Sequence, residues 1–194
     1  LEGQVLPALL TGEVDDVFQT GMPLSEITID EIILMLKQKT AALLTFSVTA
    51  GGLIGLNCVD LDHPYLRALR TYSENMGIAF QLQDDYLGIV GNEEKFGKPV
   101  GSDFTEGKRT VAVKIAWNNA SDTQKATLEK LLGKPDLNKD EIDLMKQLVT
   151  ECGGIDTIRQ MAKEHIDVAI GALEELPETT AREFLKEIAG YAIN

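Results

Sequence analysis

Residues 75–91 read NMGIAFQLQDDYLGIVG, a stretch that is apolar on almost every face of a helix. A helix that is apolar all round is normally packed in the interior of a protein. Only two of its side chains, Asp84 and Asp85, carry a charge. The helical pattern extends back to Pro64, a residue type favoured in a first helical turn, and forward to about Val90. The stretch therefore predicts a long buried helix in an all-α protein.

The rest of the chain has the same periodicity, and no segment alternates with period two for long enough to propose a strand. Capping-box pairs mark helix starts, and glycines mark helix ends. We therefore expect one antiparallel helical bundle over residues 1–194, with no domain boundary. Besides residues 64–90, the expected helices are residues 28–50, capped by Thr28 and Glu31 and ended by Gly51 and Gly52; a helix beginning with residues 111–117; a helix capped by Ser121 and Gln124 and stopped by Gly133; and residues 140–150, 155–176 and 180–192, the last capped by Thr180 and Glu183.

The pair Asp84 and Asp85 is costly in an apolar helix, because burial and mutual repulsion both disfavour two charged carboxylates. Gln81 precedes the pair by three and four residues, so its side chain faces both. A solvated acidic face is the usual explanation of such a pair. The apolar setting favours a metal site instead. Magnesium suits it, because this ion binds carboxylate oxygens, keeps several waters and bridges to phosphate.

Lys39 is a second polar group in an apolar setting. With Thr40 beside it, this lysine interrupts the apolar face of the helix expected at residues 28–50. Its aliphatic stem could pack at the edge of the bundle while the ammonium group stays in water. Alternatively, the ammonium group points into a cavity and binds an anion. The residues themselves leave both interpretations open.

The segment after the acidic helix is rich in glycine and carries Lys98, Lys108 and Arg109 in a chain whose net charge is -13. Glycines let backbone amides approach an anion, although a solvated loop has the same composition. An acidic chain is a poor partner for nucleic acid or for anionic membranes, so a phosphate-bearing ligand needs local lysines or metal ions. No apolar run is expected to reach transmembrane length. The two cysteines lack metal-ligand spacing.

Four motifs, in order, resemble the trans-type polyprenyl diphosphate synthases. Residues 80–88, FQLQDDYLG, resemble the family's second aspartate-rich motif, F-Q-x-x-D-D-x-x-D. Residues 97–110 resemble its lysine-bearing loop, residues 39–43 its K-T-x-x-L helix, and residues 12–16 its G-Q-x-x-D segment. The resemblance covers about residues 12–110, and the later helices agree only in type.

The resemblance implies an isoprenoid synthase fold with its first helices missing, because the family places its first aspartate-rich motif before the residue that matches Leu1. We therefore expect a fragment that is inactive alone. Two positions depart from the family pattern. Gly88 stands where the second motif ends in aspartate, so metal binding is expected to rest on Asp84, with Asp85 assisting. Glu13 replaces the usual glutamine.

The function implied by the resemblance is that of a magnesium-dependent prenyltransferase, which joins isopentenyl diphosphate head to tail to an allylic diphosphate. A cytoplasmic homodimer is expected from the family, whereas product chain length is left open. The implied site has catalytic residues Lys39, Gln81, Asp84 and Lys98; substrate-binding residues Lys39, Thr40, Phe80, Gln81, Lys98 and Lys108; and the Mg²⁺ ligands Asp84 and Asp85.

Three alternatives remain at this stage. A class I terpene cyclase or squalene-type synthase shares the bundle but usually lacks the combination of the K-T helix and the lysine-bearing loop. A non-catalytic partner subunit of a heteromeric prenyl synthase could keep the same motifs. A helical interaction module would leave Asp84, Asp85 and Lys39 unexplained.

Overall fold

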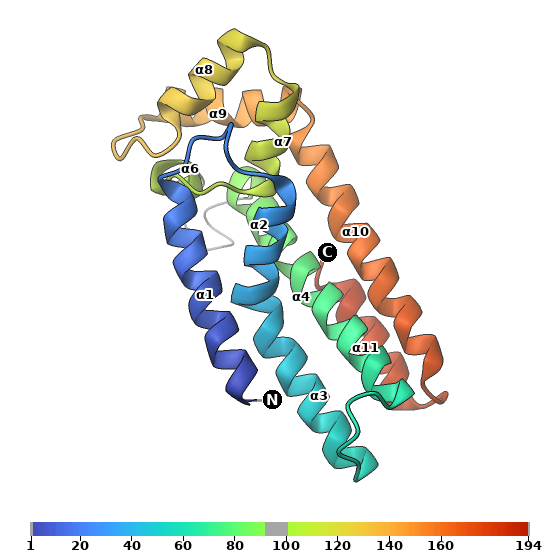
Figure 1. Cartoon of the computed structure of the whole chain (residues 1–194). Helices are drawn as coiled ribbons and strands as arrows, with labels where there is room; N and C mark the ends of the chain where they lie inside the picture. The colour runs from blue at the N-terminus through green and yellow to red at the C-terminus, as the bar shows by residue number, and fades with distance from the viewer. Residues whose placement is uncertain (1, 92–100, 194) are drawn as a thin grey trace. The chain divides into compact units, whose positions relative to one another are not determined.

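The computed structural model describes residues 2–91 and 101–193, and every regular element in these ranges is a helix (Figure 1). The all-α prediction is confirmed for this part of the chain. The elements are α1 (Glu2–Thr20), α2 (Ile29–Leu36), the π-helical turn η1 (Lys37–Ala41), α3 (Ala42–Leu56), α4 (Pro64–Val90), α6 (Ser102–Glu106), α7 (Val111–Asn119), α8 (Asp122–Leu131), α9 (Lys139–Glu151), α10 (Gly154–Ala172), the 3₁₀ turn η2 (Leu173–Glu175) and α11 (Thr180–Tyr191).

Helices α2, η1 and α3 follow one another without a break. The predicted capping box starts them, because the Glu31 carboxylate accepts a hydrogen bond of 2.8 Å from the Thr28 amide and the Glu31 amide donates to the Thr28 hydroxyl. The predicted end at Gly51 and Gly52 is wrong. The helix continues to Leu56, and Asn57 ends it in the left-handed conformation with φ 48°. Gly52 has a packing role instead, because a Cβ there would lie 2.6 Å from a side-chain carbon of Leu66.

The combined helix Ile29–Leu56 is long and apolar enough to cross a membrane, with 28 residues and a mean hydropathy of 1.3 in an 18-residue window. The expectation that no apolar run reaches transmembrane length is therefore wrong. The few polar residues of this helix do not bring its mean hydropathy below the value typical of a membrane-spanning helix. A helix in the interior of a protein can meet the same criterion. Length and composition therefore do not place this helix in a membrane.

From α4 onward, the helices agree with the sequence prediction except at three places. Helix α10 ends at Ala172 and continues as the 3₁₀ turn η2. Thr179, rather than Thr180, caps α11, because its hydroxyl accepts from the Arg182 amide. The short helix α6 lies in the segment expected to be a loop, between Gly101 with φ 86° and Gly107 with φ 73°. Helix α6 has only five residues between these two left-handed glycines, so it is too short to show a helical periodicity in the sequence.

The chain forms two compact units. Unit 1 consists of Leu1–Gly12, Leu36–Gln81 and Met161–Asn194, and unit 2 consists of Glu13–Met35 and Leu82–Gln160. The expectation of a single domain over residues 1–194 stays a prediction.

In unit 1, α3 and α4 are antiparallel. Gly52, late in α3, lies against Leu66 at the start of α4, while Ala41, just before α3, lies against Gly77 further along α4. The buried Tyr72 hydroxyl donates to the Leu185 carbonyl at 2.9 Å, and burial raises the pKa of Tyr72 to about 12. Around it lies a buried cluster of Ala79, Ile166, Ala169, Leu173 and Ala189.

In unit 2, α7 forms the centre, because all of its residues from Val111 to Ala116 are buried. Two cations beside it bind carbonyl groups in the connection between α1 and α2. The Arg109 guanidinium donates to Met22 at 2.7 and 3.0 Å, and the Lys114 ammonium donates to Leu24 at 2.7 Å. Arg109, counted in sequence as part of a basic loop, therefore has a structural contact.

Candidate active site

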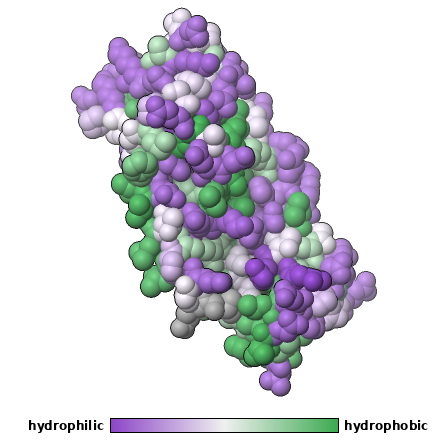
Figure 2. Space-filling model, in the orientation of Figure 1, coloured by the Kyte–Doolittle hydropathy of each residue, from purple (hydrophilic) through white to green (hydrophobic). Residues whose placement is uncertain are grey.

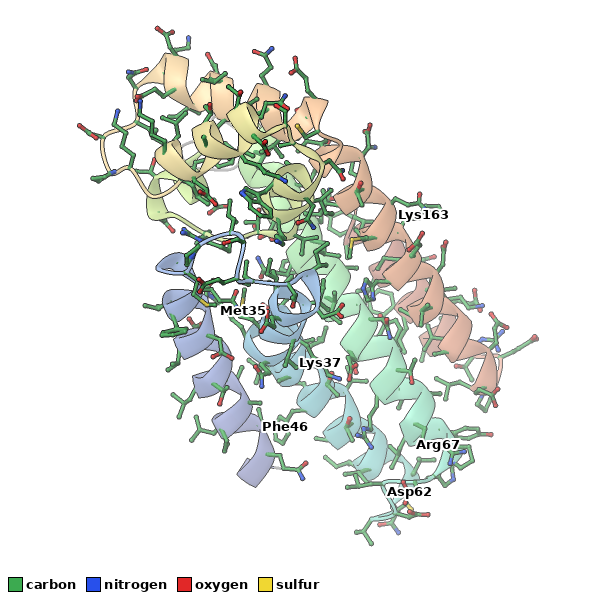
Figure 3. All side chains as sticks on the ribbon, turned by 45° about the horizontal axis from the view of Figure 1, so that its top comes forward. Met35, Lys37, Phe46, Asp62, Arg67 and Lys163 are labelled. Atoms are coloured by element: carbon green, nitrogen blue, oxygen red, sulfur yellow. The ribbon has the colours of Figure 1, made fainter. Side chains whose placement is uncertain are left out.

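Lys39 and Thr40 lie on the π-helical turn η1, which the sequence did not predict. The amide of Ala42 donates to the carbonyl of Lys37, five residues earlier, as in a π-helix. Such turns widen a helix by one residue and occur often at functional sites. Lys37, labelled in Figure 3 on this helix, forms an ion pair of 2.7 Å with Glu74 of α4. Lys39 and Thr40 are themselves half-buried.

Gln81 of α4 contacts Thr40 directly. The Thr40 hydroxyl donates to the Gln81 amide oxygen at 2.9 Å. This bond joins the predicted K-T helix to the predicted aspartate-rich helix within unit 1. Two residues predicted to bind substrate, 41 positions apart in sequence, are therefore in contact.

Helix α4 is buried on one side only, which corrects the prediction of a helix buried all round. Ile78 and Leu82 are buried, whereas Phe80 is 52% exposed and Asp84 is also exposed. The prediction failed because it assumed that every apolar side chain of this helix is buried. Phe80 is apolar, yet half of its surface remains exposed. Phe80 is therefore accessible, and its role in binding substrate remains a prediction.

Asp84 and Asp85 have different surroundings. Asp84 is exposed, and Asp85 is only 7% exposed. Consecutive residues of an α-helix point about 100° apart. One carboxylate can therefore face open space while its neighbour faces the protein. The prediction that both acids are buried is confirmed for Asp85 and wrong for Asp84.

The carboxylate at Asp84 fits the chemistry of magnesium, which takes one or two protein carboxylates and completes its shell with waters and phosphate oxygens. Within residues 2–91 and 101–193, no group of three or more His, Cys, Asp or Glu side chains could hold a metal ion.

Asp103 lies next to Gly88, one helical turn after Asp84, and sequence reasoning missed this proximity. A Cβ at position 88 would lie 2.7 Å from Asp103 Oδ2. The Gly101 amide donates to the Gly88 carbonyl at 3.0 Å and so holds the start of α6 against α4. The Asp103 carboxylate thus occupies the space beside the position where the family motif has its last aspartate. Only the tertiary fold of unit 2 could reveal this.

Lys108 is paired with two acids. Its ammonium group lies 2.9 Å from Asp103 and 3.0 Å from Glu106. Burial lowers the pKa of Lys108, but the two ion pairs outweigh burial and raise that pKa above its ordinary value. Lys108 is therefore a charged group beside Asp103. Its predicted contact with a diphosphate remains a prediction, and Lys98 lies outside the described residues.

Comparison with known proteins identifies the family. Residues 3–152 match the sequence model of the polyprenyl synthetases. The chain belongs to the polyprenyl synthetase family. Both Lys39–Thr40 and Asp84–Asp85 lie inside the matched range, so the resemblance predicted from four motifs is confirmed.

Relatives of this polyprenyl synthetase family chain carry related names. It is 34% identical over 170 residues to the geranylgeranyl diphosphate synthase of Saccharolobus solfataricus, covering 87% of this chain and 50% of that protein. It is 35% identical, with the same coverage, to a short chain isoprenyl diphosphate synthase of Methanothermobacter thermautotrophicus. The chain therefore spans about half the length of the curated relatives it matches.

Solved structures of the polyprenyl synthetase family confirm the predicted isoprenoid synthase fold. The geranylgeranyl pyrophosphate synthetase of Pyrococcus horikoshii matches with a TM-score of 0.88 and 34% identity, over 98% of this chain and 56% of that one. A polyprenyl synthase of Caulobacter crescentus, solved with calcium and isoprenyl diphosphate, matches with a TM-score of 0.88 and 28% identity, over 98% of this chain and 56% of that one.

Proposed function

We propose that the chain acts in the head-to-tail condensation of isopentenyl diphosphate with an allylic diphosphate. The observation that carries the proposal is the family match over residues 3–152, which includes the half-buried Lys39–Thr40 turn and the exposed carboxylate of Asp84. The relatives' names include geranylgeranyl and short-chain isoprenyl diphosphate synthases. These names do not favour the alternatives of a terpene cyclase or a plain interaction module.

Each site residue has a distinct role in this proposal. Lys39 and Thr40 bind the diphosphate of the allylic substrate, and Gln81 orients the Thr40 hydroxyl through their 2.9 Å hydrogen bond. Asp84 would hold magnesium, which would supply positive charge to neutralise a leaving diphosphate and so favour breakage of the allylic C–O bond. The double bond of isopentenyl diphosphate forms the new C–C bond. The released pyrophosphate takes the proton that this carbon skeleton loses.

Divalent metal is supported by two observations. Asp84 offers an exposed oxygen donor of the type magnesium prefers. A solved relative that is 28% identical was crystallised with calcium and isoprenyl diphosphate. The choice of magnesium for this chain is our proposal.

A homodimer is also proposed, on the basis of exposed apolar side chains along α1. Leu6, Leu10, Val14 and Val17 are each between 59% and 70% exposed. Their spacings of four, four and three residues place them on one stripe of the helix. Figure 2 shows hydrophobic residues along the edge where Figure 1 draws α1. Exposed apolar stripes of this kind mark interaction surfaces.

Two measurements test the proposed function. Magnesium and pyrophosphate together should raise the melting temperature of this chain, because they bind the folded state. Condensation of radiolabelled isopentenyl diphosphate with an allylic diphosphate should be measured in the longer protein that contains this chain. Protection by magnesium pyrophosphate without condensation would favour a non-catalytic partner subunit. Absence of both would refute the proposal.

A further inference from the structure

The π-helical turn η1 is packed against a glycine of α1. A Cβ at Gly12 would meet the backbone of the turn, lying 2.8 Å from Lys39 Cα and 2.9 Å from the carbonyl carbon of Gln38. It would lie closer still to the Lys39 nitrogen. These are backbone atoms, which cannot move aside as the end of a flexible side chain can. Only glycine lets α1 approach this turn so closely.

A second glycine packs against the same turn from α4. A Cβ at Gly77 would lie 2.6 Å from Ala41 Cα and 2.7 Å from Ala41 Cβ. Ala41 is the last residue of η1. Unit 1 therefore holds this π-helical turn between one glycine of α1 and one glycine of α4. Two glycines of α3 differ, because a Cβ at Gly51 or Gly55 would lie in open space.

The width of this turn determines where Lys39 points. A π turn contains one residue more than the α-helical turn it replaces, and one residue changes the direction of a side chain by about 100°. An isolated π turn is less favourable than an α turn and persists where surrounding contacts hold it. Gly12 contacts the turn at Lys39 itself, and Gly77 contacts it two residues later.

We propose that Gly12 and Gly77 are positioning residues, which hold the π turn in the width and place that aim Lys39 and Thr40 at a diphosphate. The inference rests on the proposed function, because it takes Lys39 to be a diphosphate-binding group. A methyl group at either glycine would shift the backbone of the turn.

The test uses the variants Gly12→Ala and Gly77→Ala of this chain, with Gly55→Ala as the matched control. Titration calorimetry measures the binding of inorganic pyrophosphate at saturating magnesium. We expect each of the two variants to weaken binding roughly tenfold or more, the effect of displacing one charge-assisted hydrogen bond. Gly55→Ala should leave the affinity unchanged and raise the melting temperature, since alanine favours a helix over glycine.

A double-mutant cycle separates positioning from general loss of structure. Lys39→Ala removes the group that Gly12 is proposed to aim. Adding Gly12→Ala to Lys39→Ala should therefore cause little further loss, whereas two independent effects would multiply. Amide hydrogen exchange should show faster exchange at residues 37–42 in Gly12→Ala, with exchange over α10 and α11 unchanged.

The outcomes distinguish a failure of the proposed function from a failure of the positioning role of Gly12 and Gly77. If the wild-type chain does not bind magnesium pyrophosphate, or if Lys39→Ala binds it equally well, the proposed function fails. If Lys39→Ala weakens binding while the folded Gly12→Ala and Gly77→Ala chains bind like wild type, the positioning role is overturned. Global unfolding of both glycine variants would also overturn it, because the close contacts would then serve the fold rather than the turn.

Discussion

At the scale of single residues, the exposed Asp84 and the buried Asp85 should respond differently to substitution. Asp84→Asn removes the negative charge of an exposed carboxylate that is proposed to hold magnesium. We expect it to abolish the rise in melting temperature caused by magnesium and pyrophosphate. The melting temperature without these ligands should stay the same, as for most surface substitutions. Differential scanning fluorimetry measures both quantities, with Asp143→Asn on α9 as an exposed control. An undiminished rise in Asp84→Asn would remove Asp84 from the site.

Gly88 gives a second prediction at this scale. Alanine in a helix is normally more stable than glycine by roughly 0.5–1 kcal/mol. At position 88 the added methyl group would meet the Asp103 carboxylate, which Lys108 holds by an ion pair of 2.9 Å. We expect Gly88→Ala to lower the free energy of unfolding by about 1 kcal/mol, a typical cost for a local clash. Urea unfolding measures this value. Asp103→Ala in the same chain should recover part of it, and no recovery would contradict the contact.

The chemical types of the site residues could be predicted from sequence, but their surroundings could not. Two adjacent aspartates in an apolar stretch indicate a site, yet sequence cannot say which of them faces open space, because burial depends on neighbouring helices. The contact between Asp103 and Gly88 has the same limitation, since the two residues are 15 positions apart in the chain. Thr40 and Gln81 were both predicted as site residues from motifs. The hydrogen bond between them was not predictable, because it depends on how η1 packs on α4.

At the scale of secondary structure, the start of α11 tests the corrected capping residue. The Thr179 hydroxyl accepts from the Arg182 amide at 3.2 Å, and Thr180 is the first residue of the helix. Loss of an N-cap threonine costs about 1 kcal/mol. Thr179→Ala should therefore lower the free energy of unfolding by that amount. Thr180→Ala is the matched control and should leave it almost unchanged. A larger loss in Thr180→Ala than in Thr179→Ala would instead support the capping box of Thr180 and Glu183 that was predicted from the sequence.

A pH dependence follows from the contact between α4 and α10. His165 Nδ1 lies 2.8 Å from the Asn75 side-chain oxygen, and burial lowers the pKa of His165 below its ordinary value of 6.5. The folded chain therefore prefers the neutral imidazole. This preference stabilises the fold above about pH 6.5 and is lost as the pH falls towards the lower folded-state pKa. We expect the free energy of unfolding to fall less steeply between pH 7.5 and 5.5 in His165→Gln than in wild type.

The control for this prediction is His63→Gln, which changes the only other histidine of the chain. It should keep the wild-type slope. Equal slopes in wild type and His165→Gln would show that burial does not lower the pKa of His165 enough to matter. Urea unfolding at each pH provides the comparison, with the carboxylates contributing equally to all three chains.

Helix boundaries show where sequence patterns stop being informative. Thr28 and Glu31 marked a true helix start because a capping box is a local interaction. Gly51 and Gly52 did not mark an end, because glycine in a helix can also permit close packing. The π turn at Lys37–Ala41 left no sign in the sequence. Its cause lies in α1 and α4, which are far away along the chain.

At the scale of the whole molecule, the order of the motifs predicted the family, because four spaced motifs seldom coincide by chance, and the match over residues 3–152 confirmed it. The division into two units was not predictable, since its boundaries fall inside helices α1, α2, α4 and α10 rather than in linkers. Association between copies belongs to the same scale. It depends on which apolar side chains remain uncovered, and a hydrophobic pattern alone cannot distinguish a core face from an interface.

The proposed homodimer predicts the effect of charge on α1. Leu10 is 59% and Val14 64% exposed on one stripe of the helix. Each copy carries a net charge of -13, so two copies repel one another unless apolar contact offsets the repulsion. Leu10→Lys with Val14→Lys reduces that negative charge and should still convert a dimer to a monomer, because it places ammonium groups in the apolar contact. Sedimentation equilibrium at micromolar concentration measures the change. Val59→Lys, at a site that is 95% exposed outside α1, alters the charge alone and should remain dimeric. A wild-type chain that sediments as a monomer, or a doubly substituted chain that stays dimeric, would exclude this stripe as the interface.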